Sequence, residues 1–213
     1  MLSLSNIRRA LARHRPETGA GPRRAAVALV LAGEEDALHL CFIRRAEVAG
    51  DRWSGHMALP GGHADPTDAD ATATAVRETQ EEVGLPLAGS QQIGALSDIP
   101  VRRPGEETAL VLSGRVFALG RELLPLTPNY EVAEAYWIPL AHLWEPGNAT
   151  WLELDGGGPG AARIYPGIRF RDQVIWGLTF RVLTLFSDVL DHPLPHLEDI
   201  PEPRRVPGDP ASR

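Results

Sequence analysis

The sequence predicts an α+β protein in which mixed β-strands pack against helices. Several short segments have the composition of strands, and two longer segments carry apolar residues at helical spacing. The chain shows no internal repeat and no boundary of a second domain. Its 213 residues, 43% of them hydrophobic, are enough to bury one sizeable core. We therefore expect a single sandwich-like domain.

The first strands are expected to form a hairpin. Residues 25–31 (AAVALVL) and 38–44 (LHLCFIR) are rich in aliphatic residues, and the GEED between them is a turn sequence. Downstream, MALP leads into Gly61 and Gly62. Two adjacent glycines indicate a turn in which the backbone comes close to another group.

A helix is expected after this turn. Pro66 precedes Thr67 and Asp68, either of which can serve as the N-cap, and Gly84 ends the helix in the conformation that glycine adopts most easily. One stripe of the helix carries Ala73, Val76, Gln80 and Val83, and the opposite face carries Glu78, Glu81 and Glu82. In structural terms, this pattern is typical of an amphipathic helix with its acidic face in water.

The remaining elements follow in order. Strands are predicted for residues 93–96, 108–119 and 133–138, and a second hairpin for 152–154 and 162–170 around the loop DGGGPG. Residues 174–190 are apolar at helical spacing, which predicts a mostly buried helix. These elements define a domain over residues 25–190. An N-terminal helix and linker (1–24) precede it, and a proline-rich flexible tail (191–213) comes after it.

Composition excludes several classes of partner. The net charge of −7 disfavours extended binding to nucleic acid or to an anionic membrane, and no apolar run is long enough to span a bilayer. The single cysteine, Cys41, rules out disulfides within the chain and fits a reducing compartment. The arginine-rich N-terminus could be an organellar address, but Leu2, Ile7 and Leu11 also suit a helix lying on the domain. We expect a cytoplasmic monomer or homodimer with a small-molecule substrate.

The segment RETQEEVGL, residues 77–85, carries the strongest chemical signal. Its carboxylates at positions 78, 81 and 82 share one helix face, where like charges repel one another. Water or a metal ion must offset this repulsion. Clustered carboxylate oxygens are suitable ligands for Mg²⁺ or Mn²⁺.

The longer stretch LPGGHADPTDADATATAVRETQEEVGL resembles the signature of the Nudix hydrolases, GX5EX7REUXEEXGU, which is called the box below. The C-terminal half matches, except that Thr79 replaces the usual aliphatic residue. Upstream, Asp68 stands where the pattern has glutamate, and one extra residue separates it from Arg77. The extra residue and the sequence of the turn, GGHADPTD, resemble the coenzyme A pyrophosphatase branch of that family.

This resemblance implies a Nudix-type α/β/α sandwich with a mixed β-sheet, and a pyrophosphohydrolase that uses Mg²⁺ or Mn²⁺. It implies that Glu78 and Glu82 ligate the metal directly, that Glu81 does so directly or through water, and that the carbonyl of Gly61 is a further ligand. Arg77 is expected to pair with Glu81 at i+4 and hold it in place.

The general base is open at this stage. Glu81 or Glu82 could serve as the base. The expected catalytic residues are therefore Glu81, Glu82 and Arg77. Carboxylates outside the box are the alternative: Glu131 and Glu134, or Glu106 and Glu107 in another loop. Each of these outside acids could equally be a solvated loop residue.

Two further stretches bear on the substrate. IWGLT, residues 175–179, resembles a segment of the coenzyme A pyrophosphatase branch, and there Gly177 could also allow close packing. The branch motif before the box fits at Arg45 and Gly55, but Asp51 occupies the position of an expected arginine. Arg52, one residue further on, is the candidate to take over the role of that arginine in binding a substrate phosphate. Trp53 could stack on an adenine or pack at a rim.

Four other arginines are candidates for binding phosphate or for simple solvation: Arg44 and Arg45, and Arg102 and Arg103. The favoured reaction is hydrolysis of coenzyme A or acyl-coenzyme A to 3′,5′-ADP and 4′-phosphopantetheine. The alternatives are nucleoside triphosphates, ADP-ribose or dinucleotide polyphosphates as substrates. A nucleotide-sensing module with a dead box is more remote, since all three box glutamates are present.

Overall fold

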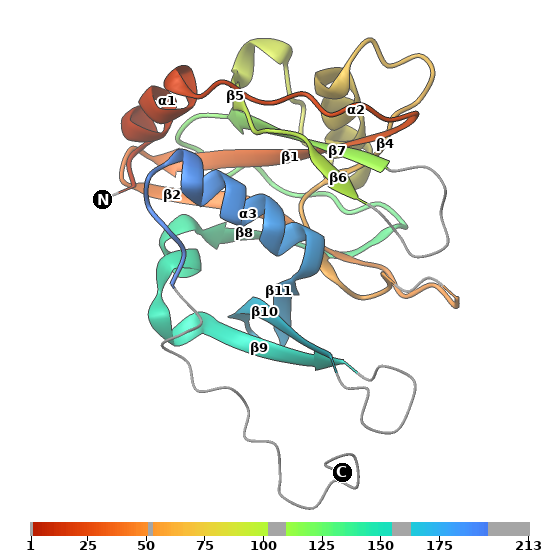
Figure 1. The fold of residues 1–213 in the computed structure, drawn as a ribbon, viewed down its shortest axis with the longest axis vertical. Helices are drawn as coiled ribbons and strands as arrows, with labels where there is room; N and C mark the ends of the chain where they lie inside the picture. Colours follow the sequence, from red (N-terminus) through yellow and green to blue (C-terminus); the bar gives the residue numbers. More distant parts are fainter. Residues whose placement is uncertain (1, 51–52, 102–109, 155–162, 196–213) are drawn as a thin grey trace, which may run out of the picture.

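A computed structural model describes residues 2–50, 53–101, 110–154 and 163–195 (Figure 1). The central layer is an eight-stranded sheet. Five strands follow the order β3-β2-β1-β7-β5, whereas β4 pairs with β1, β6 with β7 and β8 with β2. The bounds are β1 Arg23–Glu34, β2 Ala37–Arg45, β3 Met57–Ala58, β4 Gly61–His63, β5 Gln92–Ala95, β6 Ile99–Val101, β7 Leu110–Ala118 and β8 Val132–Pro139.

The sheet is mixed, as predicted. β1 and β2 form the expected antiparallel hairpin, with Leu31 opposite Leu40, while β1 and β7 run parallel. Alternate residues of β1 point to opposite faces, and both faces are covered, so this strand is apolar almost throughout. The short strands β3, β4 and β6 were not predicted, because two or three residues carry too little pattern.

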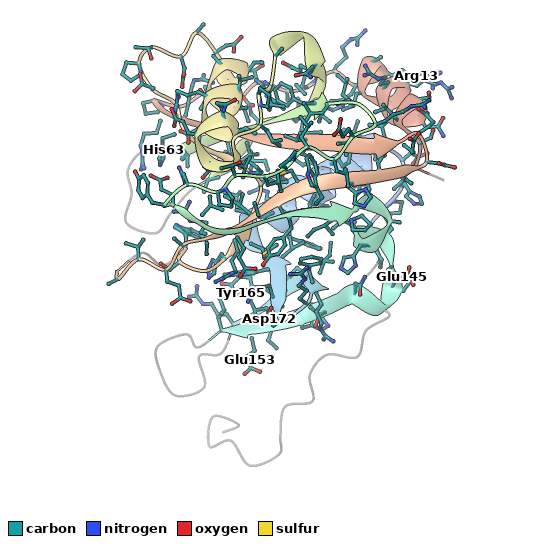
Figure 2. All side chains as sticks on the ribbon, turned by 180° about the vertical axis from the view of Figure 1, so that it is seen from behind. Arg13, His63, Glu145, Glu153, Tyr165 and Asp172 are labelled. Carbon is teal, nitrogen blue, oxygen red and sulfur yellow. The ribbon has the colours of Figure 1, made fainter. Side chains whose placement is uncertain are left out.

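Helices cover both faces of the sheet. Helix α2 (Ala71–Val83) packs over the face that includes Ala28 and Val30. Helices α1 (Leu4–Arg13) and α3 (Gly177–Val189) cover the opposite face, where Leu29 and Leu31 lie. Accordingly α3 lies in front of the sheet in Figure 1, and α2 lies in front of it in Figure 2, the view from behind. The layers form the predicted α/β/α sandwich.

A three-stranded sheet, in the order β11-β10-β9, packs beside α3 (Figure 1). Its strands are β9 (Ala149–Leu154), β10 (Arg163–Phe170) and β11 (Gln173–Trp176), and three short 3₁₀ turns lie elsewhere: η1 (Gly89–Gln91), η2 (Leu140–Trp144) and η3 (Pro146–Asn148). The predicted hairpin of β9 and β10 forms. The helix predicted over residues 174–190 forms as α3, but it begins only at Gly177, because Ile175 pairs with Ile168 as a strand. A Cβ at Gly177 would meet nothing within 4 Å, so its φ of 62°, and not close packing, favours glycine there.

Helix α2 begins later than predicted. Its N-cap is Asp70, not Thr67 or Asp68, because Asp70 Oδ1 accepts hydrogen bonds of 2.8 Å from the N–H groups of Thr72 and Ala73. The predicted C-terminal end is confirmed, since Gly84 is left-handed with φ 71°.

The predicted apolar stripe of α2 is confirmed only in part: Val83 is buried and Val76 packs against the core, but the buried face is rotated relative to the prediction. Gln80 is exposed and Val76 half-buried, whereas Thr79 and Glu82 are buried with Ala75 and Val83. The helix therefore turns one of its three box carboxylates, Glu82, into the protein. Glu82 as a residue is 3% exposed, so its carboxylate requires polar partners inside the fold.

The N-terminal segment forms a helix that lies on the domain. Ser3 caps α1, and Ile7 and Leu11 are buried on the α3 side of the sheet. The division of the chain at residues 24 and 190 stays a prediction, and most of the proposed tail lies outside the described residues. None of the described helices is long and apolar enough to cross a bilayer.

Candidate active site

The Gly61–Gly62 turn lies against α2. The Gly61 N–H donates a 2.8 Å hydrogen bond to Glu82 Oε2. A Cβ on Gly62 would lie 2.5 Å from the carboxylate of Glu78, and Gly61 has φ 151° with Ala26 O 2.3 Å from where its Cβ would be. Only glycine allows this approach. The close contact that the two glycines predicted is therefore with the box carboxylates and with β1.

Arg77 joins the acidic side chains around it. Its Nε and Nη2 donate to the two carboxylate oxygens of Asp68 at 3.1 and 2.9 Å. Its Nη1 donates to Glu78 Oε1 at 2.9 Å and to Glu81 Oε2 at 3.2 Å, and Nη2 also reaches the carbonyl of His63, which Figure 2 shows beside α2. The expected contact with Glu81 is present, but the bidentate partner is Asp68.

The position of Asp68 accounts for the unusual spacing of the box. Since α2 begins only at Ala71, Asp68 lies in the preceding turn, where an extra residue is accommodated without breaking the helix. Thr74 Oγ1 also donates to Asp68, at 2.9 Å. The Arg77 hydrogen bonds hold the pKa of Asp68 far below its usual range, and Asp68 in turn raises the pKa of Arg77. Both groups therefore stay charged.

The two inner carboxylates are electrostatically strained. Burial raises the pKa of Glu82 to about 7; the Gly61 N–H and Arg45 oppose this shift, and Glu78 and Glu131 add to it. Burial likewise raises the pKa of Glu78, against the effect of Arg77. Glu81 is largely exposed. Glu131 thus lies close enough to Glu78 and Glu82 to disfavour the charged forms of those two carboxylates.

The chemistry of these groups fits a hard divalent cation. The donors are carboxylate and carbonyl oxygens, the ligands that Mg²⁺ and Mn²⁺ prefer, and a cation would offset the crowding of negative charge. Within the described residues, no three His, Cys, Asp or Glu side chains already converge on a point that could hold a metal. Glu78 faces Arg77 and Glu82 faces the Gly61 N–H. Each of these contacts uses one of the two oxygens of its carboxylate.

A loop far along the chain completes the acidic site. The N–H groups of Thr127 and Asn129 donate to the last carbonyls of α2, Val83 O at 2.8 Å and Glu82 O at 3.1 Å. Asn129 Oδ1 then accepts from the N–H of Glu131 at 2.8 Å. This docking places Glu131 near Glu78 and Glu82. Nothing local in the sequence signals it, because the contact depends on the tertiary position of the helix end.

Glu134, the other outside acid in this region, has different surroundings. Its Oε1 accepts from Arg44 Nη2 at 2.7 Å, and its Oε2 accepts from the Tyr136 hydroxyl at 2.5 Å. Tyr136 and Arg44 lower the pKa of Glu134. The structure therefore separates the two candidates: Glu131 lies with the box, and Glu134 pairs with Arg44.

A pocket of about 270 Å³ opens on the α3 side of the Gly61–Gly62 turn. The IWGLT segment contributes Trp176 to Thr179, and Arg45 both lines the pocket and acts electrostatically on Glu82. The rings of His56 and Trp176 meet edge to face at 4.9 Å. The predicted phosphate ligands Arg52, Arg102 and Arg103, like the acids at 106 and 107, lie outside the described residues.

Comparison with known proteins identifies the family. The NUDIX domain profile matches residues 22–154, which is more than half of the chain. The chain therefore belongs to the Nudix family, and the prediction of a Nudix pyrophosphohydrolase is confirmed at that level. Nudix hydrolases generally use divalent metal ions, so the prediction of such an ion also stands at family level.

Two curated relatives are informative. The human mitochondrial coenzyme A diphosphatase NUDT8 is 33% identical over 84% of this chain and 74% of its own length. A protein of Schizosaccharomyces pombe, uncharacterized protein C14C4.10c, is 36% identical over 64% of this chain, but the match spans only 47% of that protein.

A solved structure agrees with the fold. The MutT/nudix family protein from Enterococcus faecalis superimposes with a TM-score of 0.55 over 92% of this chain and 74% of that chain, at 18% identity. At that identity the likeness concerns the fold alone. It confirms the predicted Nudix-type sandwich.

Proposed function

We propose that this protein hydrolyses the pyrophosphate bond of coenzyme A or an acyl-coenzyme A, giving 3′,5′-ADP and (acyl-)4′-phosphopantetheine. One observation carries the proposal: the Gly61–Gly62 turn joins a cluster of acidic groups on α2 to a pocket that the IWGLT segment lines. Diphosphate chemistry and a binding site for an attached group thus share one backbone turn. The likeness to a human coenzyme A diphosphatase supports this substrate class.

Mg²⁺ or Mn²⁺ would be held by Glu78, Glu82 and the Gly61 carbonyl, with Glu81 directly or through water. When bound, the ion supplies charge stabilisation on the phosphate oxygens and a more acidic water. Arg77 positions the carboxylates by its hydrogen bonds to Asp68, Glu78 and Glu81. Arg45, which lines the pocket and acts electrostatically on Glu82, is the described arginine best placed to contact the diphosphate.

For the general base we favour Glu131. Its loop is fixed to the end of α2, near Glu78 and Glu82, and the Tyr130 hydroxyl hydrogen-bonds its carboxylate, whereas Glu134 is held away by Arg44 and Tyr136. Glu131 would accept a proton from the attacking water as its oxygen bonds to phosphorus and the bridging P–O bond breaks.

A second substrate class rests on a specific observation. Asp51 stands where the coenzyme A branch has an arginine, and this substitution favours a nucleoside triphosphate, ADP-ribose or a dinucleotide polyphosphate. A sensing module without activity is disfavoured, because all three box glutamates are retained. We further propose a small-molecule partner and a monomer or homodimer. A cytoplasmic location stays a prediction, since the human relative is named as mitochondrial.

A substrate panel with product identification tests the proposal. With Mg²⁺ or Mn²⁺, coenzyme A and acyl-coenzyme A should be cleaved to 3′,5′-ADP faster than ADP-ribose, nucleoside triphosphates or dinucleotide polyphosphates. EDTA should stop turnover, and added metal should restore it. Faster cleavage of one of the other nucleotides would show that coenzyme A is not the preferred substrate. Full activity in chelator would overturn the metal mechanism.

A further inference from the structure

The pocket on the α3 side of the Gly61–Gly62 turn is built mainly from aliphatic and aromatic side chains. Val27 of β1 and Leu112 of β7 form its sheet wall, and Leu178 and Val182 of α3 form the opposite wall. Trp53, His56 and Trp176 lie at its aromatic end, with Tyr165 packed behind Trp176 at 5.2 Å. Such a surface favours an apolar ligand group.

Few polar side chains line this pocket, and part of their hydrogen-bonding capacity is already used. Among the described lining residues these are Arg45, His56, His63 and Thr179, and Thr179 Oγ1 donates to the Met57 carbonyl at 3.2 Å. A nucleobase carries several edge donors and acceptors, which lose free energy when buried without partners. The aliphatic walls offer none.

The two halves of coenzyme A carry different groups next to the diphosphate. On the pantetheine side, the phosphate ester leads to a carbon with two methyl groups. On the nucleotide side, it leads to a ribose that bears a hydroxyl and a 3′-phosphate. An apolar wall directly beside the diphosphate position matches the dimethyl carbon. It would leave a ribose phosphate without ligands.

We propose that this pocket binds the pantetheine half of the substrate, with the acyl thioester toward the aromatic end, so that the 3′-phosphoadenosine half extends away from α3. The proposal rests on the proposed function, which it deepens by assigning the orientation of the substrate. It makes Leu178 and Val182 determinants of acyl-chain preference.

The test measures binding without catalysis. S-hexanoyl-pantetheine and adenosine 3′,5′-bisphosphate are titrated separately into the protein in EDTA, and tryptophan fluorescence is recorded. Hexanoyl-pantetheine should change the fluorescence of the wild type but much less that of Trp176→Phe. Since each buried methylene changes affinity about fourfold, Leu178→Trp, which fills the pocket, should weaken hexanoyl-pantetheine at least about 10-fold.

Leu185→Trp is the matched control, because it makes the same substitution on the same helix at a residue that does not line this pocket. It should leave both affinities unchanged. Thermal melting of all variants separates a filled pocket from a damaged fold. If hexanoyl-pantetheine does not bind, or if Leu178→Trp weakens adenosine 3′,5′-bisphosphate instead, the assigned orientation is overturned.

The substrate panel keeps this result distinct from the proposed function. If the protein hydrolyses coenzyme A but fails the binding test, the proposed function stands and the assigned orientation of the substrate is wrong. A protein that binds hexanoyl-pantetheine in this pocket, yet hydrolyses no coenzyme A derivative, retains the pocket assignment and loses the proposed reaction.

Discussion

The two sides of the Gly61–Gly62 turn differ in almost every physical property. On the α2 side, Arg77 hydrogen-bonds three carboxylates, and Glu82 is buried against a backbone N–H. On the α3 side, the pocket walls are aliphatic and aromatic. Under the proposed function, this difference would place bond cleavage and substrate selection in separate layers of the sandwich. Substitutions on the α2 side should change turnover, and those on the α3 side should change selectivity.

The largest effect is expected from Glu82→Gln. Glutamine keeps the shape but removes the charge of a proposed metal ligand, so kcat should fall about 10³-fold or more while KM changes little. Steady-state rates with Mg²⁺ check this, and Mn²⁺ titration by electron paramagnetic resonance should show weaker binding. Turnover within about tenfold of wild type would remove Glu82 from the metal site.

A smaller but sharper contrast separates the two outside acids. Glu131→Gln should lower kcat about 10²-fold or more if Glu131 is the base. Glu134→Gln breaks an exposed pair with Arg44 and should alter kcat less than about threefold. If both substitutions have equally small effects, Glu131 is not the general base, and Glu81 or Glu82 of the box is the remaining candidate.

The burial of Glu82 predicts a stability effect opposite to its effect on activity. Its pKa is raised from 4.5 to about 7, so the folded state binds more protons than the unfolded state between these values. Stability is lost as pH rises through this window. In EDTA, Glu82→Gln should therefore match wild type near pH 4.5 and exceed it by up to about 3 kcal/mol at pH 8. Urea unfolding at both pH values measures this, and a pH-independent difference would contradict it.

The smallest effect is expected at Thr79, the departure from the usual aliphatic residue in the box. Its buried hydroxyl donates to Ala75 O at 2.6 Å, a carbonyl within its own helix. Thr79→Val should thus change the free energy of unfolding by less than about 1 kcal/mol. Thr74→Val is the matched control, because that equally buried hydroxyl donates to charged Asp68 and its loss should cost about 1.5–3 kcal/mol. If Thr74→Val and Thr79→Val change the free energy of unfolding by similar amounts, the hydrogen bond from Thr74 to Asp68 contributes no additional stability.

Local patterns predicted the parts of the fold that depend on neighbouring residues. The β1–β2 hairpin follows from two apolar runs and a short turn, and the end of α2 follows from Gly84. The start of α2 was wrong because Thr67, Asp68 and Asp70 are all competent caps. Most of the strand Gln173–Trp176 was predicted as helix, because a run of four residues rich in apolar side chains fits the repeat of a helix as well as that of a strand. Pairing with β10 makes this segment a strand.

The site shows the same limit. The box sequence indicated a cluster of acids near two glycines, and the structure brings Glu78 and Glu82 to that turn. It could not indicate that Glu82 is buried, because the direction of the helix face depends on the sheet beneath it. Nor could it place Glu131 beside the box and Glu134 with Arg44, since both positions depend on contacts between segments distant in sequence.

The parallel pairing of β1 with β7, from Arg23 opposite Leu110 to Leu31 opposite Ala118, also has a kinetic consequence. Strands β2 to β6 and helix α2 lie between these two strands in the chain, so the centre of the sheet closes only after a long loop has been ordered. During synthesis, β1 and β2 can pair early, but the other edge of β1 stays open until β7 leaves the ribosome. An apolar strand edge exposed for that time is prone to aggregate, which makes the nascent N-terminal half a natural client for chaperones.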